Sequence, residues 1–311
     1  MSFISQLFGY LLNWLYEFFN NYGIAIILFS ILLRVILIPI TIKQQSTMKK
    51  TAKIQEKMSE IQKKYKNNPE KLNQETIELY KKENMSPFSG CLSSILQIVI
   101  ILAVFWLVSQ PLTYMRKINP EIINKYTQEL QESGNSNSGY MQIAVIQNAE
   151  NKYNEISTQL ENENVENREE LENLKNEYNQ LRLNMDFLGI DLSKVPTQSL
   201  NDWRVYIIPV LYVITSVLSI KITTSVQNKN KKQVIVNENG EEEPDPMEQA
   251  QAMTKNMTYM MPIMSVMIAI VAPLGLALYW LVSNVLMIIE RLIINKIMER
   301  KEDEEEETAN A

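Results

Sequence analysis

Apolar residues gather in four regions of the chain, separated by segments rich in charged and polar residues. The regions span Tyr22–Ile42, Cys91–Val108, Val205–Ile222 and Met257–Ile294. A helix needs about 20 residues to cross the hydrocarbon core of a bilayer, so each of the first three predicts one crossing. The fourth is nearly twice that length and is interrupted at Ala272–Gly275, where a proline favours a helix break. The pattern therefore predicts five membrane-spanning helices.

The segment before the first apolar region has an amphipathic pattern. Its polar residues Gln6, Asn13, Glu17 and Asn20 recur at spacings of seven, four and three, which places them on one stripe of a helix. Such a helix is typical of a segment that lies in the outer interface of a membrane. A further span is the alternative interpretation. The apolar face carries Phe3, Leu7, Tyr10, Leu11, Trp14, Leu15 and Phe18.

The lysine-rich segment between the first two apolar regions predicts a helical hairpin. Semi-apolar positions recur every three or four residues from Met48 to Tyr65, and the pattern stops just before Asn68 and Pro69. Asn68 is a natural N-cap and Pro69 a natural first helical residue, so a second helix is expected there. Residues 43–83 hold eleven lysines and six glutamates. Because basic loops stay in the cytoplasm, we expect the hairpin inside, the N-terminus outside and the C-terminus inside.

The other polar segments complete the expected organisation. Residues 111–203 hold eight basic and fifteen acidic residues, and a short heptad-like run from Leu171 to Leu181 predicts a helical hairpin there. The whole pattern predicts an all-α membrane protein. Its expected order is an external interfacial amphipathic helix (1–21), span 1 (22–42), a cytoplasmic helical hairpin (43–86), span 2 (91–110), an external helical insertion (111–203), span 3 (205–222), a cytoplasmic loop (223–256), span 4 (257–272), span 5 (274–294) and an acidic cytoplasmic tail (295–311).

The composition argues against most catalytic chemistry. Cys91 is the only cysteine, so there is no disulfide framework and no paired-cysteine metal site. Histidine is absent, which removes the commonest general base near neutral pH. The chain also lacks the short motifs of nucleotide hydrolases, zinc proteases and serine hydrolases. We therefore expect no catalytic residue, no metal site and no cofactor, in a protein that is not an enzyme.

One charged residue interrupts the first apolar region. Arg34 lies near the middle of the stretch Gly23–Ile42. A guanidinium at mid-depth costs about 2.5–3.5 kcal/mol on insertion scales, and it cannot lose its proton to escape that cost. We expect the spans to offer it no Asp or Glu partner. A cation of this kind would face water inside the membrane or await an anion, which marks Arg34 as a candidate functional residue.

Short motifs at the membrane boundaries point to one family. With Arg34, Pro39 and the charged hairpin, they closely resemble the YidC/Oxa family of membrane protein insertases over residues 20–110 and 186–295. The motifs are MSPFSGCLSSILQ at 85–97, FLGIDLS at 187–193, YIIPVL at 206–211, MTYMMPIM at 257–264 and LALYWLVSN at 276–284.

The resemblance implies a fold and a function. It implies a five-span bundle that encloses a groove, open to the cytoplasm and to lipid but closed on the outer side. The family's intramembrane arginine maps to Arg34, which would attract acidic residues of an incoming chain. The implied activity is that of an insertase and chaperone, which takes client transmembrane segments into the groove and releases them to lipid. No nucleotide would be hydrolysed, and the protein would act alone or with the Sec translocon in the bacterial plasma membrane.

The implied site and partners follow from polarity within the spans and from the lysine hairpin. The clients would be nascent membrane proteins. Ser and Thr in spans more often serve helix packing, and Tyr279 and Trp280 fit a role in packing or as interface anchors equally well, so these alternatives stay open. The hairpin is the expected contact for a ribosome, a signal recognition particle receptor or anionic lipids. The candidate groove residues are Arg34, Gln97, Ser94, Thr215, Ser216, Tyr279, Trp280 and Asn284, and the candidate docking residues are Lys49, Lys50, Lys53 and Lys57.

The main rival is an anion-conducting channel or a small-solute transporter, because buried arginines also mark anion paths. An ion-coupled transporter would typically carry intramembrane acids and repeated halves. Transport predicts solute flux across a membrane, whereas insertion predicts that a client protein becomes protected from protease.

Overall fold

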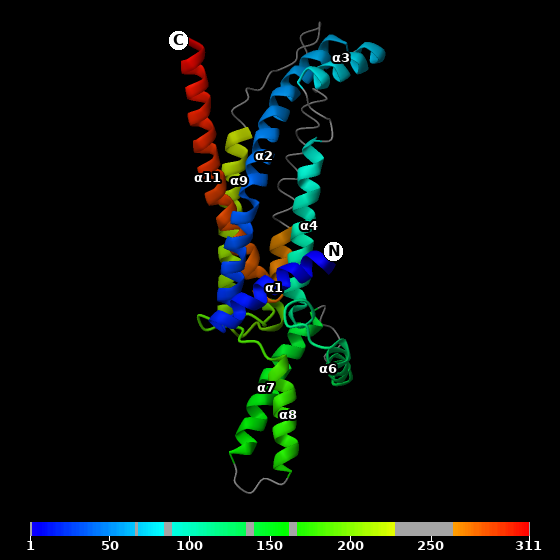
Figure 1. The fold of residues 1–311 in the computed structure, drawn as a ribbon, viewed down its shortest axis with the longest axis vertical. Helices are drawn as coiled ribbons and strands as arrows, with labels where there is room; N and C mark the ends of the chain where they lie inside the picture. Colours follow the sequence, from blue (N-terminus) through cyan, green and yellow to red (C-terminus); the bar gives the residue numbers. More distant parts are fainter. Residues whose placement is uncertain are drawn as a thin grey trace. The chain divides into compact units, whose positions relative to one another are not determined.

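The computed structural model describes residues 2–65, 68–83, 89–134, 140–161, 167–227 and 264–310. Within these residues the chain is almost entirely helical, which confirms the predicted all-α class (Figure 1). The described strands form a single short hairpin, in which β1 (Asp186–Phe187) pairs antiparallel with β2 (Ile190–Asp191). The turn between them has positive φ angles at Leu188 and Gly189, a conformation that glycine adopts without strain.

The longest described segment between two α-helices, residues 182–206, holds the strand hairpin and two 3-10 turns. The bounds of the helices and turns are α1 (Ser2–Phe19), α2 (Tyr22–Lys64), α3 (Pro69–Lys82), α4 (Ser89–Ser109), α5 (Pro111–Tyr114), α6 (Pro120–Glu132), α7 (Met141–Leu160), α8 (Arg168–Leu181), the 3-10 turns η1 (Pro196–Gln198) and η2 (Trp203–Tyr206), α9 (Ile207–Gln227) and α11 (Leu274–Asn310). Residues 264–271 are helical as well.

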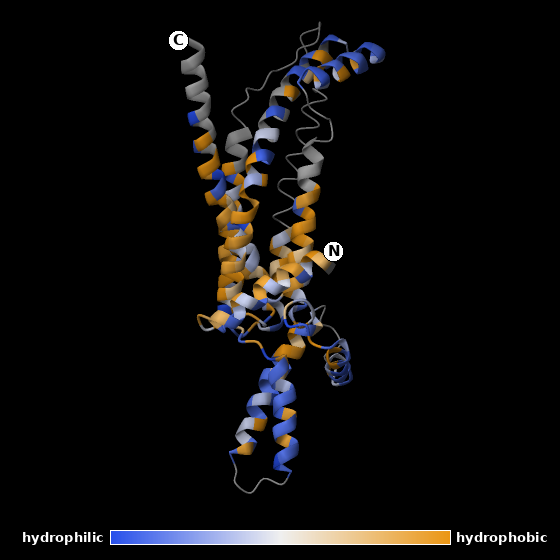
Figure 2. Cartoon of the chain, viewed as in Figure 1, coloured by the Kyte–Doolittle hydropathy of each residue, from blue (hydrophilic) through white to orange (hydrophobic). Residues whose placement is uncertain are grey.

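Three of the described helices contain segments long and apolar enough to cross a membrane: Tyr22–Thr47, Trp203–Ile222 and Leu274–Ile294. A shorter apolar helix covers Ile95–Ser109. In Figure 2 the apolar colouring is concentrated in these helices, whereas α7 and α8 are mostly hydrophilic. Part of the predicted fourth span, residues 257–263, lies outside the described residues. The five-span arrangement therefore stays a prediction.

The chain divides into two compact units, whose boundaries fall within helices. The first unit comprises Met1–Leu32, Leu102–Thr223 and Met261–Glu290, and the second comprises Leu33–Ile101, Thr224–Met260 and Arg291–Ala311.

In the first unit, α1 packs against α5 through small residues. A Cβ atom added at Gly9 would lie 1.9 Å from the carbonyl oxygen of Tyr114, so only glycine permits this approach. Ser5, one turn earlier, is fully buried and its hydroxyl donates to the carbonyl of Ala103 at 3.0 Å. The sequence pattern predicted one apolar and one polar face for this helix. The structure adds a third face, formed by Ser5, Gly9, Leu12 and Tyr16, that is buried in the first unit.

The external insertion predicted for residues 111–203 forms part of the first unit and contains α6, α7 and α8. Figure 1 shows α7 and α8 side by side, and the Arg182 guanidinium joins them by donating to both carboxylate oxygens of Glu150, at 2.7 and 2.8 Å. Lys125 on α6 pairs with Glu177 on α8 at 2.8 Å. These helices also bury apolar residues, among them Ile123, Ile146 and Leu181, and the ion pairs add to this packing.

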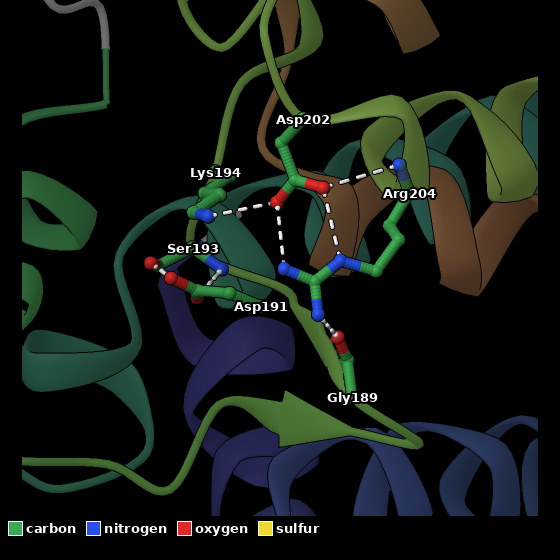
Figure 3. Close-up of polar contacts among 6 residues, drawn as sticks. All are labelled: Gly189, Asp191, Ser193, Lys194, Asp202 and Arg204. Carbon is green, nitrogen blue, oxygen red and sulfur yellow. Dashed lines mark hydrogen bonds and ion pairs between the residues drawn. The ribbon is translucent and has the colours of Figure 1, made fainter.

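A loop that follows α8 connects several helices of the first unit. The backbone N–H groups of Leu274 and Gly275 donate to carbonyls of Lys194 and Leu192, both at 2.9 Å. Asp202 accepts hydrogen bonds from the side chains of Arg204 and Lys194, which hold the pKa of that carboxyl well below its usual range (Figure 3). The loop thereby fixes the start of α9 and the start of α11 to one another.

In the second unit, α3 folds back along the later part of α2. The Asn68 side chain accepts a hydrogen bond from the backbone N–H of Lys71 at 3.1 Å, and Pro69 begins α3, so both predicted roles are confirmed. The Tyr65 hydroxyl donates to Glu75 at 3.0 Å, and Ile54 is buried. The two helices are thus joined by side chains on both sides of the turn.

Candidate functional site

Arg34 lies on α2, within the second unit, and its side chain is half-buried. The expectation that it is an isolated cation was wrong, because Arg34 has an interaction partner in the structure. The expectation that the predicted spans hold no acid was also wrong, since Glu290 lies inside span 5 (274–294). What remains distinctive is the setting of the cation: Val35 and Ile36, the next residues on the helix, are exposed apolar side chains.

Gln97 lies on α4, also in the second unit, and is half-buried. The neighbouring Ile95 and Ile98 are exposed, as expected for a helix whose surface contacts lipid. The side chain of Ser94 lies outside the described residues, so its prediction is untested. A role of Arg34 and Gln97 in client binding stays a prediction.

Three of the predicted groove residues meet in the first unit. The Asn284 amide nitrogen on α11 donates to the hydroxyl oxygens of Thr215, at 3.2 Å, and Ser216, at 3.1 Å, on α9. The Thr215 hydroxyl in turn donates to the carbonyl of Tyr212 at 3.0 Å. Asn284 and Ser216 are buried, with exposed fractions of 7% and 5%. This cluster is neutral and its groups satisfy one another, so its direct effect is to hold α9 against α11.

An aromatic pair extends the same helix contact. The ring of Trp280 on α11 lies 6.3 Å from the ring of Tyr212 on α9, measured between centroids. Tyr279 is buried, whereas Trp280 is half-buried. Tyr212 was not predicted as a site residue. Its spacing from Ser216 and Ser219, four and seven residues, places all three on one face of a helix and would have identified it.

The structure describes two of the four lysine side chains that were predicted as docking residues. Lys50 and Lys57 are exposed, while the side chains of Lys49 and Lys53 lie outside the described residues. The Lys57 ammonium pairs with Glu83 at 2.5 Å, and this hydrogen bond lowers the pKa of the Glu83 carboxyl. Lys57 therefore has an intramolecular role at the open end of the hairpin in addition to the predicted docking role.

Metal chemistry finds no support in the part of the chain that the structure describes. No group of three or more His, Cys, Asp and Glu side chains is placed there to hold an ion.

The family of the chain follows from comparison with known proteins. The profile of the 60Kd inner membrane protein family matches residues 14–302, and the chain belongs to this family. The resemblance found in the sequence motifs is thereby confirmed.

Similar proteins carry the name "Membrane protein insertase YidC". One from Caldanaerobacter subterraneus subsp. tengcongensis is 40% identical over 105 residues, which are 34% of this chain and 51% of the relative. One from Wolinella succinogenes is 43% identical over 105 residues, 34% of this chain and 20% of the relative. One from Treponema denticola is 25% identical over 297 residues, 96% of this chain and 38% of the relative. The chain thus spans about half the length of the first relative, and less of the other two.

Proposed function

We propose that this chain is a membrane protein insertase of the bacterial plasma membrane. The observation that carries the proposal is the family match over residues 14–302, together with relatives that bear the insertase name. The apolar helices α2, α9 and α11 supply the membrane-embedded part that such an activity needs. Its clients would be nascent membrane proteins.

The proposed mechanism uses polar side chains on apolar helices to lower a client partway into the bilayer. Arg34 attracts acidic residues in the client's polar segment, and Gln97 offers hydrogen bonds to its backbone. The client's apolar helix then moves into lipid, with a driving force of about 25 cal/mol per Å² of apolar surface removed from water. This step needs no nucleotide, because burial of the client supplies the free energy. The Sec translocon would supply clients that need help with larger polar segments.

The hairpin of α2 and α3 is proposed as the cytoplasmic docking element. Its lysines exceed its glutamates, and both ribosomal RNA and the cytoplasmic leaflet are anionic. A ribosome, a signal recognition particle receptor or anionic lipid would therefore be held by charge and released at higher salt. The acidic end of α11 would be repelled by the same partners. With the hairpin in the cytoplasm and five spans, the N-terminus would lie outside and the C-terminus in the cytoplasm.

Reconstitution tests the proposal directly. The purified full-length chain in proteoliposomes should make a one- or two-span client, synthesised in the presence of the vesicles, resistant to added protease. Empty vesicles and vesicles with an unrelated five-span protein are the controls. The rival function is measured on the same vesicles as the flux of chloride and of small solutes. Solute flux without client protection would overturn the insertase proposal in favour of a channel or transporter.

A further inference from the structure

The first helix carries an exposed aromatic ridge on the first unit. Its buried face packs on α5, and its exposed face is formed by Phe3, Leu7, Tyr10, Trp14 and Phe18, of which Tyr10 is 63% and Trp14 61% exposed. Exposed apolar side chains in such a continuous row are unfavourable in water. In a membrane interface the same row would contact acyl chains, while the tyrosine and tryptophan polar groups reach the headgroup level.

Two cations from a distant part of the sequence lie against α1, one on the ridge and the other beside the buried face. Arg116 and Lys117 follow α5, and the Lys117 ammonium lies 2.7 Å from the centroid of the Tyr10 ring. The Arg116 guanidinium lies 5.9 Å from the centroid of the Tyr16 ring. Lys117 has a φ of 53°, in the left-handed region that non-glycine residues rarely adopt. Such backbone strain persists only where surrounding contacts hold it, and here it directs the lysine side chain onto α1.

The position of the pair along the chain suits a phosphate group. The apolar helix α4 ends at Ser109, only seven residues before Arg116, so the pair follows directly on a segment with the character of a membrane span. The close contact between Gly9 and Tyr114 keeps α1 at the same level. A headgroup phosphate lies at this boundary, just outside the hydrocarbon core.

The local charge is that of a site for a singly charged anion. The Arg116 Nη1 atom lies 3.9 Å from a carboxylate oxygen of Glu17, whose side chain is 62% exposed. Two cations and one carboxylate leave a net charge of about +1. The Nε atom of Arg116 is buried and has no hydrogen-bond partner in the structure. A lysine above an aromatic ring retains N–H donors, so Lys117 can donate to an acceptor at the surface. Arg116, whose side chain is 27% exposed, contributes its positive charge.

We propose that Arg116, Lys117 and the α1 ridge form a binding site for the phosphate of an anionic phospholipid, with its acyl chains against Leu7, Tyr10 and Trp14. The charge of one phosphodiester matches the net charge of the site. The bound lipid would anchor α1 at the membrane surface and keep it packed on α5. The site is independent of the proposed insertase activity, since it requires only that α1 and α5 contact the bilayer.

The test uses Trp14 as a reporter in the full-length chain. The other tryptophans are replaced by Trp106→Phe, Trp203→Phe and Trp280→Phe, and the protein is reconstituted in nanodiscs. Quenching of Trp14 is then measured with brominated phosphatidylglycerol and with brominated phosphatidylcholine at equal content. We expect a preference of about fivefold for phosphatidylglycerol, since a basic residue near an anionic membrane contributes about 1 kcal/mol. The variant Arg116→Gln with Lys117→Gln should lose this preference.

Matched variants distinguish lipid binding at Arg116 and Lys117 from non-specific attraction of anionic lipid by the positive charge of the protein. Lys125→Gln with Lys175→Gln removes two cations from the helices α6 and α8 and should leave the preference unchanged. Glu17→Gln removes the competing carboxylate and should increase the preference. The lipid preference of Glu17→Gln tests the proposed site even if the variant that lacks both cations fails to fold. An unchanged preference in Glu17→Gln, or equal quenching by the two lipids in the unmodified site, would overturn the proposal.

Discussion

At the scale of single residues, the polar side chains inside the apolar helices are positioned by one another. Asn284 reaches two hydroxyls on α9, so its amide donors are satisfied without water. Hydrogen bonds between membrane helices contribute about 0.6 kcal/mol on average and up to about 1.7 kcal/mol, because the alternative states also find partners. Asn284 was proposed as a groove residue, and its burial makes its effect on α9 and α11 the first property to measure.

We predict that Asn284→Leu lowers the stability of the folded chain in detergent by about 0.6–1.7 kcal/mol. The substitution removes both interhelix hydrogen bonds and leaves the Ser216 hydroxyl without its donor. The measurement is thermal or denaturant unfolding followed by circular dichroism. The control is Val285→Ala, the next residue on α11, which is exposed and should change stability by less than about 0.5 kcal/mol. Equal effects of the two substitutions would contradict the role assigned to Asn284.

Arg34 is predicted to act by charge rather than by shape. Arg34→Glu and Arg34→Ala should reduce insertion of clients with acidic external segments by about tenfold or more, since one charge pair at about 4 Å is worth about 4 kcal/mol at an effective dielectric constant of about 20. Arg34→Lys should retain much of the activity. Protease protection in proteoliposomes is the measurement, and Lys43→Glu on the same helix is the control. Wild-type activity of Arg34→Glu on such clients would refute the electrostatic mechanism.

At the scale of elements, local sequence signals located where α3 and α11 begin, but not where the longest helices end or which faces they bury. The predicted spans end at Ile42 and Ile294, whereas α2 continues to Lys64 and α11 to Asn310. Asn68 and Pro69 start α3 as predicted, because capping depends on residues within one turn. The break at Pro273 likewise separates the helical residues 264–271 from α11. The buried face of α1 could not be predicted, since Gly9 and Ser5 are small because of α4 and α5, about 100 residues away. The spacing of apolar and polar residues within α1 does not indicate which helices it will contact.

The contact between α6 and α8 should depend on pH through Glu177. The hydrogen bond from Lys125 lowers the pKa of this carboxyl. A carboxylate with a lowered pKa in the folded state stabilises the fold above the unfolded value, about 4.3, and loses this effect as the pH falls through the lowered pKa. Glu177→Gln should therefore reduce stability at pH 7 by about 0.2–1 kcal/mol, as for other exposed pairs. The difference from wild type should shrink in thermal unfolding as the pH is lowered from 7 toward the acid range, and a constant difference would contradict this assignment.

The lysine hairpin should act through its exposed charge. Reversal of Lys49, Lys50 and Lys53 to Glu in the full-length chain should weaken binding of ribosomes or of vesicles with anionic lipid, most strongly at low salt, because each contact contributes about 1 kcal/mol and is screened. Co-sedimentation at two salt concentrations measures this. Lys57→Glu is a separate variant, since it also breaks the pair with Glu83. If deletion of Met48–Glu83 with a Gly/Ser bridge leaves client insertion at the wild-type rate, the hairpin is only a tether.

At the scale of the whole molecule, the segregation of charge determined most of what the sequence predicted. Apolar runs longer than 17 residues are rare outside membranes, so the helical class and most of the apolar helices were predictable. The contacts that join the elements were not predictable. Asn184 accepts from the backbone of Tyr22 and donates its own N–H to the Tyr16 hydroxyl, across more than 160 residues of sequence. Hydrogen bonds between residues so far apart leave no pattern in the local sequence, so they can be identified only in the folded structure.

Topology is the property of the whole molecule on which the proposed activity depends, because a client must enter from the side where it is synthesised. We predict that α3 faces the cytoplasm and α7 the outside. In a Cys91→Ser background, Asn73→Cys on α3 and Asn151→Cys on α7 place single thiols at positions that are both exposed. An impermeant thiol reagent added to intact cells should label Asn151→Cys, and should label Asn73→Cys only after permeabilisation. The parent without a new cysteine should not react. Since both positions are exposed, a difference in labelling reports the membrane barrier, and labelling of both from outside would overturn the five-span arrangement.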